Sequence, residues 1–442
     1  MWVLFRQFPI KKWTPVTTSI PILAIDFGTS NSLLAAATVD GVIEPIPLDP
    51  TASDPTVLRT VLFSPEKGKW YFGNNAIHEY QQHSADGRLF RSIKKYLPDI
   101  SFSGTQVHGT FRSLPEIIAF FLREMRERAN LHFDQDCTDV VIGRPARFSD
   151  DPSDDKLAET RLENAAKLAG FKSISFVPEP VAAAHQFRHE LTEDKNVVIA
   201  DFGGGTSDFT VLRMGPGELK DKDILAIGGV STAGDAFDSS IMRSMIVPHF
   251  GSNVVYRLPM GSNDLRLPNN LITRMCSPAD MALLMRGDIL ALLKDAQRWS
   301  LNPEDGKRMD RLFTLAEEHL GYALFRAIER CKIDFSTKTS SQFEFPHPGI
   351  EISETLQNKD FQTNSEVVVE RIVKSLDATV AASGLSYAQI DVVCCTGGTA
   401  RIPALNARLT DRFGAGKLQQ FKNFHSVVGG LAEKALLLAL QK

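Results

Sequence analysis

Two stretches of this chain follow the same pattern. Residues 21–31 read PILAIDFGTSN, and residues 196–208 read NVVIADFGGGTSD. In each stretch an apolar run predicts a buried strand, which ends at an aspartate and a glycine-rich turn. Apolar runs resume at residues 33–37 and 209–212, so each stretch is predicted to be a β-hairpin. The two leading aspartates lie 175 residues apart (201 − 26), a spacing that predicts two related lobes.

The rest of the chain alternates between predicted strands and helices. Short apolar runs at residues 139–143 and 391–395 predict two further buried strands. Apolar residues recur at helical spacing over residues 157–169, 279–299, 311–335, 366–382 and 427–440. Residues 251–270 and 337–348 show little periodicity and are predicted to be loops. The alternation of strands and helices predicts an α/β fold.

The composition excludes several classes of protein. Hydrophobic residues are 43% and charged residues 23% of the 442 residues, which is typical of a globular protein. A net charge of −4 provides no positive field to hold nucleic acid or an anionic membrane. The five cysteines form no CxxC pair, and Cys394 and Cys395 lie in an apolar run, which favours buried reduced thiols in a cytoplasmic protein. Residues 1–20 lack the features of a secretory signal and are left as an unassigned tail, and no membrane span is expected.

The glycine-rich turns indicate a phosphate site. A turn that approaches phosphate oxygens closely needs glycine, because a Cβ would block the approach, and it offers free backbone N–H groups to the anion. One such turn is explained as a tight hairpin, but two copies with leading aspartates favour phosphate binding. Each aspartate either caps its turn or holds Mg²⁺ through its waters. The sequence has no GxxxxGK[ST] motif, which excludes a P-loop, and no GxGxxG after a strand, which argues against a dinucleotide site.

A third glycine-rich turn lies near the end of the chain. Residues 395–403 read CTGGTARIP, after a predicted strand and before a predicted helix. Backbone at such a place can approach a ligand at the N-terminus of the helix. A purely structural turn between a strand and a helix explains the same residues equally well.

Seven segments together resemble the ATPase domain of the heat shock 70 (DnaK-type) chaperones, within the actin/hexokinase/DnaK superfamily. In chain order they are Asp26–Asn31, Gly143–Asp150, Glu179–Ala184, Asp201–Asp208, Ala233–Asp238, Glu329–Ser336 and Gly397–Pro403. The residues of these motifs are most similar to those of the YegD-type chaperone-like proteins, which consist of the ATPase domain only. The resemblance implies an actin-like ATPase fold with two duplicated lobes and a nucleotide cleft between them. Lobe I is expected over residues 21–195 and lobe II over 196–442, with a capping subdomain near 239–320 that carries none of the motifs and a C-terminal helix that returns to lobe I.

The resemblance also implies the site residues and the cofactors, ATP or ADP with Mg²⁺. The carboxylates that hold the metal through water are expected to be Asp26 and Asp201. The catalytic residues are expected to be Lys94, which reaches the γ-phosphate, Glu179, which orients the attacking water, Thr206 and Asp208. The remaining nucleotide contacts are expected at Gly28, Thr29, Ser30, Asn31, Gly203, Gly204, Gly205, Gly234, Glu329, Lys332, Ser336, Gly397, Gly398 and Arg401.

Several of these residues have simpler interpretations. Lys94 is equally explained as a solvated charge on a helix face, and its neighbour Lys95 leaves the register open by one residue. Glu179 has the alternative of a loop residue before a proline, which the helix start of small residues at 182–184 makes weaker. Glu329 and Lys332 have the spacing of an ordinary salt bridge within a helix.

The sequence departs from the family pattern at three points. The closing helix motif, which is acidic in the family, reads Asn423-Phe424-His425-Ser426 here. The other two departures bear on the nucleobase and on the coupling to a partner. Ile333 stands where the family has an arginine that stacks on adenine, so adenine would pack on an apolar side chain. Pro145 matches the family's proline switch, but its partner arginine has no counterpart. Glu159 occupies that register, and Arg161 follows two residues later.

The function implied is a chaperone-like ATPase that hydrolyses Mg-ATP slowly in the cleft and lacks the peptide-binding domain. It is expected to act as a monomer on an unfolded protein or with a cochaperone. Two alternatives from the same superfamily are a small-molecule (sugar-type) kinase and an actin-like, nucleotide-dependent polymer. A kinase needs an acceptor-site aspartate as general base, and no convincing candidate is found near the first lobe's side of the cleft.

Overall fold

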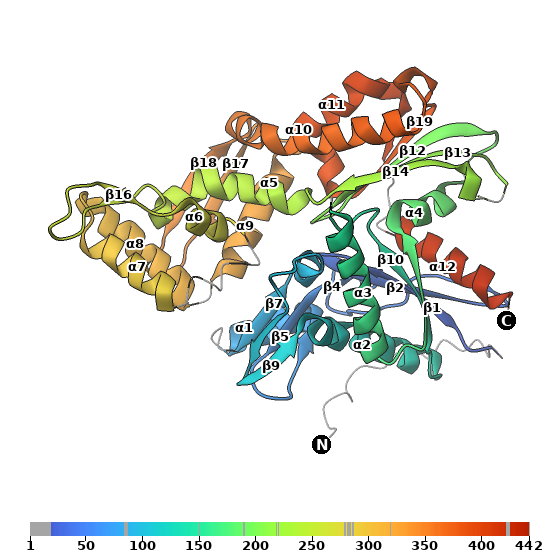
Figure 1. Ribbon diagram of the computed structural model, residues 1–442, viewed down its shortest axis with the longest axis horizontal. Coiled ribbons are helices and arrows are strands. Elements are labelled where there is room, and N and C mark those ends of the chain that lie inside the picture. Colours follow the sequence, from blue (N-terminus) through green and yellow to red (C-terminus); the bar gives the residue numbers. More distant parts are fainter. Residues whose placement is uncertain are drawn as a thin grey trace.

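The computed structural model describes residues 19–83, 87–149, 151–188, 191–217, 219, 221–277, 280, 284, 287–318, 320–420 and 425–441 (Figure 1). Nearly all of the predicted N-terminal tail therefore lies outside the described residues, and so does Asp150 of the second motif. Within the described part of the chain, no helix is long and apolar enough to cross a membrane.

The first hairpin forms the centre of a six-stranded sheet. Its strand order is β11-β10-β1-β2-β3, and β4 pairs with β2. β1 is antiparallel to β2 and parallel to β10, and β10 is parallel to β11. The strands are β1 (Ile22–Phe27), β2 (Asn31–Thr38), β3 (Gly41–Ile43), β4 (Leu58–Arg59), β10 (Asp139–Arg144) and β11 (Ser173–Pro178). We call the part of the chain built on this sheet lobe I.

The second hairpin forms the centre of a matching five-stranded sheet, with the order β14-β13-β12-β19-β20. Here β12 is antiparallel to β13 and parallel to β19, and β19 is parallel to β20. The strands are β12 (Lys195–Phe202), β13 (Ser207–Met214), β14 (Ile224–Val230), β19 (Val392–Thr396) and β20 (Leu418–Gln420). We call the part built on this sheet lobe II. Both sheets thus have the same order and direction, as the repeated hairpin predicts.

Two helices lie between the sheets, α4 (Glu179–Phe187) and α12 (Ser426–Ala439) (Figure 1). One buried apolar cluster joins them to both sheets; it includes Ala24 of β1, Ile199 of β12, Ala183 of α4 and Leu431 of α12. The helices cross closely because α12 has a glycine at the contact: a Cβ on Gly430 would lie 1.7 Å from the carbonyl oxygen of Ala182. This shared core holds the two lobes together behind the glycine turns.

The remaining elements of lobe I flank its sheet. Helices α2 (Leu114–Phe133) and α3 (Pro152–Leu168) pack on one face through a second apolar cluster. A small three-stranded sheet carries the segment with Lys94. Its elements are β5 (Val61–Ser64), β6 (Tyr71–Phe72), α1 (Gly73–Gln82) and β7 (Arg88–Arg91), followed by a 3₁₀ turn over Ile93–Tyr96. The hairpin β8 (Gly104–Val107) and β9 (Thr110–Ser113) precedes α2.

In lobe II, α10 and α11 lie beside the sheet and a group of shorter elements projects away from it, to the left in Figure 1. Both parts share one large apolar cluster. The helices are α5 (Gly234–Ile241), α6 (Asn269–Met275), α7 (Gly287–Arg298), α8 (Pro303–Glu317), α9 (Gly321–Asp334), α10 (Asn358–Ala382) and α11 (Pro403–Phe413). Two strand pairs accompany them: β15 (Val255–Tyr256) with β16 (Leu265–Arg266), and β17 (Ser340–Phe345) with β18 (Ile352–Gln357).

Two of the predicted elements are wrong. The single helix expected over 311–335 is two helices, because α8 ends at Glu317 and α9 begins at the buried Gly321. Periodicity did not detect the break, since both helices bury apolar faces in the same cluster. The loop expected over 337–348 contains β17, in which buried Ser341, Phe343 and Phe345 alternate with exposed residues as in a half-buried strand.

Candidate functional site

A cavity of about 340 Å³ lies where the two hairpin turns meet. Most of the predicted site residues line it: Asp26, Gly28, Thr29, Ser30, Asn31, Lys94, Glu179, Asp201, Gly203, Gly204, Thr206, Gly234, Glu329, Lys332, Ser336, Gly397 and Gly398. Three predicted residues, Gly205, Asp208 and Arg401, are not among the lining residues. Residues separated by more than 300 positions in the chain thus share one site.

The turns need glycine for steric reasons. A Cβ on Gly28 would lie 2.1 Å from the carbonyl oxygen of Asn31 in the same turn. A Cβ on Gly204 would lie 2.7 Å from the Ser30 hydroxyl, so the two turns approach each other across the cavity. Gly205 stands behind this contact, where a Cβ would lie 2.9 Å from the hydroxyl of Thr29. At these positions a larger residue would collide with the turns, so glycine is required where the two turns approach each other.

Asp26 and Asp201 bring two carboxyl groups into the cavity from the ends of β1 and β12. Burial, together with the negative charge of Glu179, raises the pKa of Asp201 to about 6. The same two effects raise the pKa of Asp26 well above its usual range, and Asp201 adds to them. The Thr396 hydroxyl donates a hydrogen bond to Asp201, which partly offsets the rise. The site therefore concentrates negative charge that a bound cation would relieve.

Lys94 and Glu179 form a buried ion pair, in which Lys94 Nζ lies 2.6 Å from Glu179 Oε1. Burial alone would lower the pKa of the Lys94 ammonium, but the carboxylates of Glu179 and Asp26 outweigh it and hold that pKa above its ordinary value. Lys94 is thus a buried cation held beside the carboxylates, and it is not a solvent-exposed charge on a helix face. Lys95 instead pairs with Asp280 at 3.3 Å and does not line the cavity, so of the two neighbouring lysines Lys94 is the one that the cavity contains.

Asp208 lies behind the cavity. Its carboxylate accepts a 2.6 Å hydrogen bond from the backbone N–H of Ala146, and it also accepts one from the Thr206 side chain. Burial, and then the charge of Glu179, raise the pKa of Asp208 well above its usual range. Asp208 therefore links the second glycine turn to the loop that follows β10, and it holds the backbone of that loop at Ala146.

The other end of the cavity is lined by α9. Lys332 Nζ lies 2.8 Å from Asp238 Oδ2 and 3.2 Å from the carbonyl oxygen of Gly234, while Glu329 pairs with Arg326 at 2.6 Å. The simple salt bridge between Glu329 and Lys332 is therefore not the arrangement in the structure. Instead, Lys332 ties α9 to the start of α5.

The third glycine-rich turn closes the same cavity. Gly397 has a φ of +82°, and a Cβ there would lie 2.0 Å from the carbonyl oxygen of Phe202, so only glycine fits. The Thr399 hydroxyl donates a 3.4 Å hydrogen bond to the carbonyl oxygen of Gly203, which links this turn to the second hairpin turn. Gly397 and Gly398 line the cavity, whereas the side chain of Arg401 is exposed.

A comparison with protein-family models identifies this architecture. The model described as Hsp70 protein matches residues 92–257 and 314–439. The chain belongs to the Hsp70 family. Its fold is accordingly the actin-like ATPase fold with two duplicated lobes, as the sequence predicted, and its general function is that of a chaperone-like, nucleotide-binding ATPase. The match does not cover residues 1–91, which include the first hairpin, or residues 258–313, which fall within the segment that carries none of the family motifs.

Two of the departures from the Hsp70 pattern, at Ile333 and at the partner of Pro145, can be located in the structure. Ile333 is 61% exposed at the cavity edge, where an adenine ring would meet an apolar surface. Glu159 pairs with Arg144 at 3.0 Å, so an arginine–glutamate pair adjoins Pro145, with the arginine next to the proline in sequence. Arg161 donates hydrogen bonds to the carbonyl oxygens of Tyr96, Leu97 and Asp99, and so supports the segment that follows Lys94.

The sequence analysis missed several residues that line the cavity. They are Arg59, Thr60, Arg91, Asp235, Asp238, Tyr322, Arg326, Thr396 and Thr399. Thr60 supports the first turn directly, since its hydroxyl donates a 2.8 Å hydrogen bond to the carbonyl oxygen of Gly28. Local signals were available for some of them: Arg91 precedes Lys94 by three residues, and Asp235, Asp238, Thr396 and Thr399 lie in the quoted motifs or the third turn. The others come from elements whose position in the cavity no local pattern encodes.

Proposed function

We propose that the cavity binds Mg-ATP and hydrolyses its γ-phosphate. The observation that supports this function best is the convergence of two glycine-rich turns, two carboxylates and the Lys94–Glu179 pair on one cavity. Family membership supports nucleotide binding and ATPase activity in general. The specific reaction and nucleotide are the proposal.

The residues present fit a magnesium ion. Asp26 and Asp201 supply hard oxygen donors, and each is held at a raised pKa by burial and by neighbouring negative charge. A divalent cation beside them would remove that penalty, and Mg²⁺ is commonly held by one or two carboxylates together with substrate phosphates. When bound, it would neutralise charge on the phosphate oxygens.

The residues of the chain would hold the phosphates, offset their charge and orient the attacking water. The backbone N–H groups of the two hairpin turns would hold the phosphates, and the Lys94 ammonium would offset negative charge at the γ-phosphate. Glu179 would accept a hydrogen bond from the attacking water, since its carboxylate adjoins Lys94 within the same cavity. Phosphoryl transfer leaves little covalent chemistry to the protein, so such positioning is the expected source of catalysis.

The domain assignment goes with this proposal. Lobe I would comprise residues 21–195 and lobe II residues 196–442, with a capping subdomain near 239–320. The contacts of Lys332 with Asp238 and Gly234 support a nucleoside site that adjoins that subdomain, because α5 and α9 lie at its two ends in the chain. An unfolded polypeptide or a cochaperone would be the partner whose binding the nucleotide regulates.

Steady-state release of orthophosphate from ATP tests the proposal. Asp201→Asn and Glu179→Ala should each reduce turnover by roughly 100-fold or more, because each removes a charge that acts at the reacting phosphate. Asp305→Asn is the matched control, since it changes a buried carboxyl of α8 that does not line the cavity. Circular dichroism should show the native fold in all three variants.

Unchanged turnover in both cavity variants would disprove the assignment. A wild-type protein that transfers phosphate to a sugar, with little orthophosphate released, would favour the kinase alternative. Stimulation of turnover by an unfolded peptide would support a chaperone role for the ATPase cycle.

A further inference from the structure

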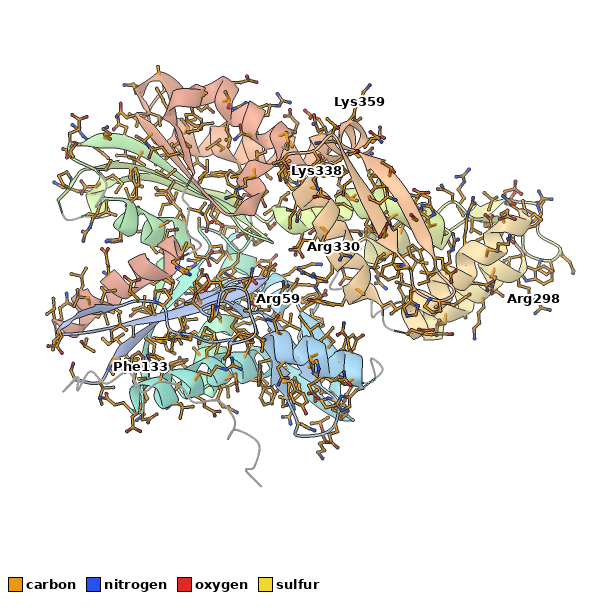
Figure 2. The ribbon with its side chains drawn as sticks, turned by 180° about the vertical axis from the view of Figure 1, so that it is seen from behind. Arg59, Phe133, Arg298, Arg330, Lys338 and Lys359 are labelled. Carbon is orange, nitrogen blue, oxygen red and sulfur yellow. The ribbon has the colours of Figure 1, made fainter. Side chains whose placement is uncertain are left out.

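Two arginines of lobe I line the cavity beside the first glycine turn. Arg59 lies in β4, where it pairs with Asn31 of β2, and Asn31 also lines the cavity. Arg91 lies in β7, where it pairs with Val61 of β5, and Val61 lines the cavity as well. Val61 follows Arg59 by two residues, so the strand pairing places the backbone of both arginines on the same side of the cavity, which both residues line. Figure 2 shows Arg59 at the junction of the two lobes. Neither arginine belongs to the motifs that carry the family resemblance.

Arg91 is held in place by lobe II. Its guanidinium carbon lies 5.4 Å from the ring centre of Tyr322 and 5.9 Å from that of Phe325, both on α9. These distances are those of a cation–π contact. The Nη1 atom of Arg91 is buried and has no hydrogen-bond acceptor among the described residues. A buried guanidinium N–H without an acceptor is costly, so this atom is available to a ligand at little further desolvation cost.

The arginine wall faces the phosphate turns. The backbone N–H of Thr60, next to Arg59, donates to the carbonyl oxygen of Ser30 at 2.9 Å. On the opposite side, the backbone N–H of Asp235 donates to the carbonyl oxygen of Gly204 at 2.7 Å. Burial raises the pKa of Asp235, and the charge of Arg91 acts against that rise, so the two side chains are near each other. Arg59 therefore adjoins the first hairpin turn, and Arg91 lies near both α9 and Asp235, whose backbone is hydrogen-bonded to the second turn.

Asp235 balances part of the charge at this wall, although neither arginine forms an ion pair within the residues that the structure describes. Asp235 is the carboxylate that acts on Arg91, whereas no ion pair of Arg59 occurs among the described residues. Two guanidinium groups that face one cavity repel each other unless an anion lies between them. Arginine presents a planar fork of donors that matches the oxygens of a phosphoryl group, in two parallel hydrogen bonds.

We propose that Arg59 and Arg91 form a phosphoryl subsite that takes the terminal phosphoryl group of the nucleotide and retains it as orthophosphate after hydrolysis. This inference rests on the proposed function, and it adds the part of the site that distinguishes ATP from ADP. Hydrolysis breaks the bond between the β–γ bridging oxygen and the γ-phosphorus, water supplies the new oxygen, and the orthophosphate stays against the two arginines. The subsite thus delays phosphate release and prolongs the state with both products bound.

Calorimetric titration with ATP and with ADP, at equal Mg²⁺, tests the subsite. Arg59→Gln and Arg91→Gln should each weaken ATP binding by about tenfold, the loss of a charge-assisted contact, and change ADP binding by less than about twofold. Arg88→Gln is the matched control. Arg88 lies on β7 with Arg91, but its side chain is exposed and donates a hydrogen bond to the Thr105 hydroxyl outside the cavity. It should leave both affinities unchanged.

Phosphate titration gives an independent measurement. Orthophosphate should bind the ADP-loaded wild-type protein about tenfold more tightly than it binds the ADP-loaded Arg59→Gln variant. Phosphate release after a single turnover should be correspondingly faster in Arg59→Gln and Arg91→Gln. Arg91→Lys keeps the charge and most of the packing on Tyr322, so it tests the fork geometry if Arg91→Gln fails to fold; it should still weaken ATP selectively.

The outcomes separate the two proposals. Equal weakening of ATP and ADP, or unchanged ATP and orthophosphate binding in both glutamine variants, would overturn the subsite and leave the proposed function intact. Orthophosphate that binds the wild-type protein equally with and without ADP would assign the arginines to a separate phosphate-bearing ligand and overturn the subsite as proposed. A wild-type protein that binds neither ATP nor ADP would overturn both.

Discussion

Asp201→Asn should stabilise the nucleotide-free protein at neutral pH, although the same substitution is expected to reduce turnover strongly. In the folded protein the Asp201 carboxyl has a pKa of about 6, against an ordinary value of 3.8, chiefly because it is buried and secondly because Glu179 is nearby. The folded state therefore holds this proton more strongly than the unfolded state does. Stability linked to this group is fully present below about pH 4 and is lost as the pH rises from 3.8 through about 6.

The magnitude follows from that interval. A difference of about two pKa units corresponds to about 3 kcal/mol above pH 6, and this is an upper limit because water in the cavity screens the carboxylate. Asparagine cannot ionise, and it keeps an oxygen that can accept the hydrogen bond from Thr396. The variant should therefore be more stable than the wild type by up to about 3 kcal/mol at pH 7.5, and equally stable near pH 4.

Urea unfolding followed by circular dichroism at pH values from 4 to 8, without nucleotide or divalent cation, measures this difference. The gain should appear between pH 4 and 6 and stay constant above that range. A variant less stable than the wild type at pH 7.5, or a gain that persists at pH 4, would refute the reasoning. Saturating Mg-ATP should reverse the order of stability, since a bound cation favours the aspartate.

Three further predictions concern the ion pair, the helix crossing and the nucleobase site. Lys94→Met should lower the free energy of unfolding by about 3–5 kcal/mol, because it leaves the buried Glu179 carboxylate without a cation, and adding Glu179→Gln should recover at least about half of that loss in urea unfolding. Gly430→Ala should lower the thermal midpoint markedly and cost about 3 kcal/mol, because the new methyl group meets the Ala182 carbonyl oxygen, whereas Gly306→Ala in open space on α8 should be neutral or stabilising by up to about 1 kcal/mol. Ile333→Arg should tighten ATP binding by about fivefold in calorimetry if adenine lies at the edge of α9, because a guanidinium stacks on the base, and unchanged affinity would place the base elsewhere.

The sequence by itself determined the parts of the site that are local. The two hairpins, their leading aspartates and their glycines were predicted because strand periodicity and turn chemistry are encoded within about ten residues. The third turn at Gly397 was found in the same way, although its role was left open between a ligand contact and a structural turn. The structure places all three turns around one cavity. The resemblance to one family added the longer-range prediction that they share a nucleotide cleft.

Other expectations failed or stayed open because they depend on packing. Apolar spacing predicted one helix over residues 311–335, although α8 ends at Glu317 and α9 begins at Gly321. The prediction failed because apolar spacing indicates which face of a helix is buried and does not indicate whether the helix axis continues. The spacing of Glu329 and Lys332 allowed a salt bridge between them, but the nearest partner of Lys332 is Asp238, 94 residues away in the chain. Asp208 follows the second glycine turn and was expected to be catalytic, yet its carboxylate lies behind the cavity and accepts a hydrogen bond from the backbone N–H of Ala146.

Only the tertiary structure decided which charges face the cavity. Lys94 and Lys95 are neighbours in sequence, and the fold buries the first against Glu179 and directs the second to Asp280. Arg59 and Arg91 gave no distinctive local pattern, and they meet at one wall because β4 pairs with β2 and β7 pairs with β5. Strand register and the choice of ion-pair partner are set by contacts between distant segments, where burial and Coulomb energy act together. The sequence thus specified the turns that can hold phosphate, and the fold specified the charges that surround them.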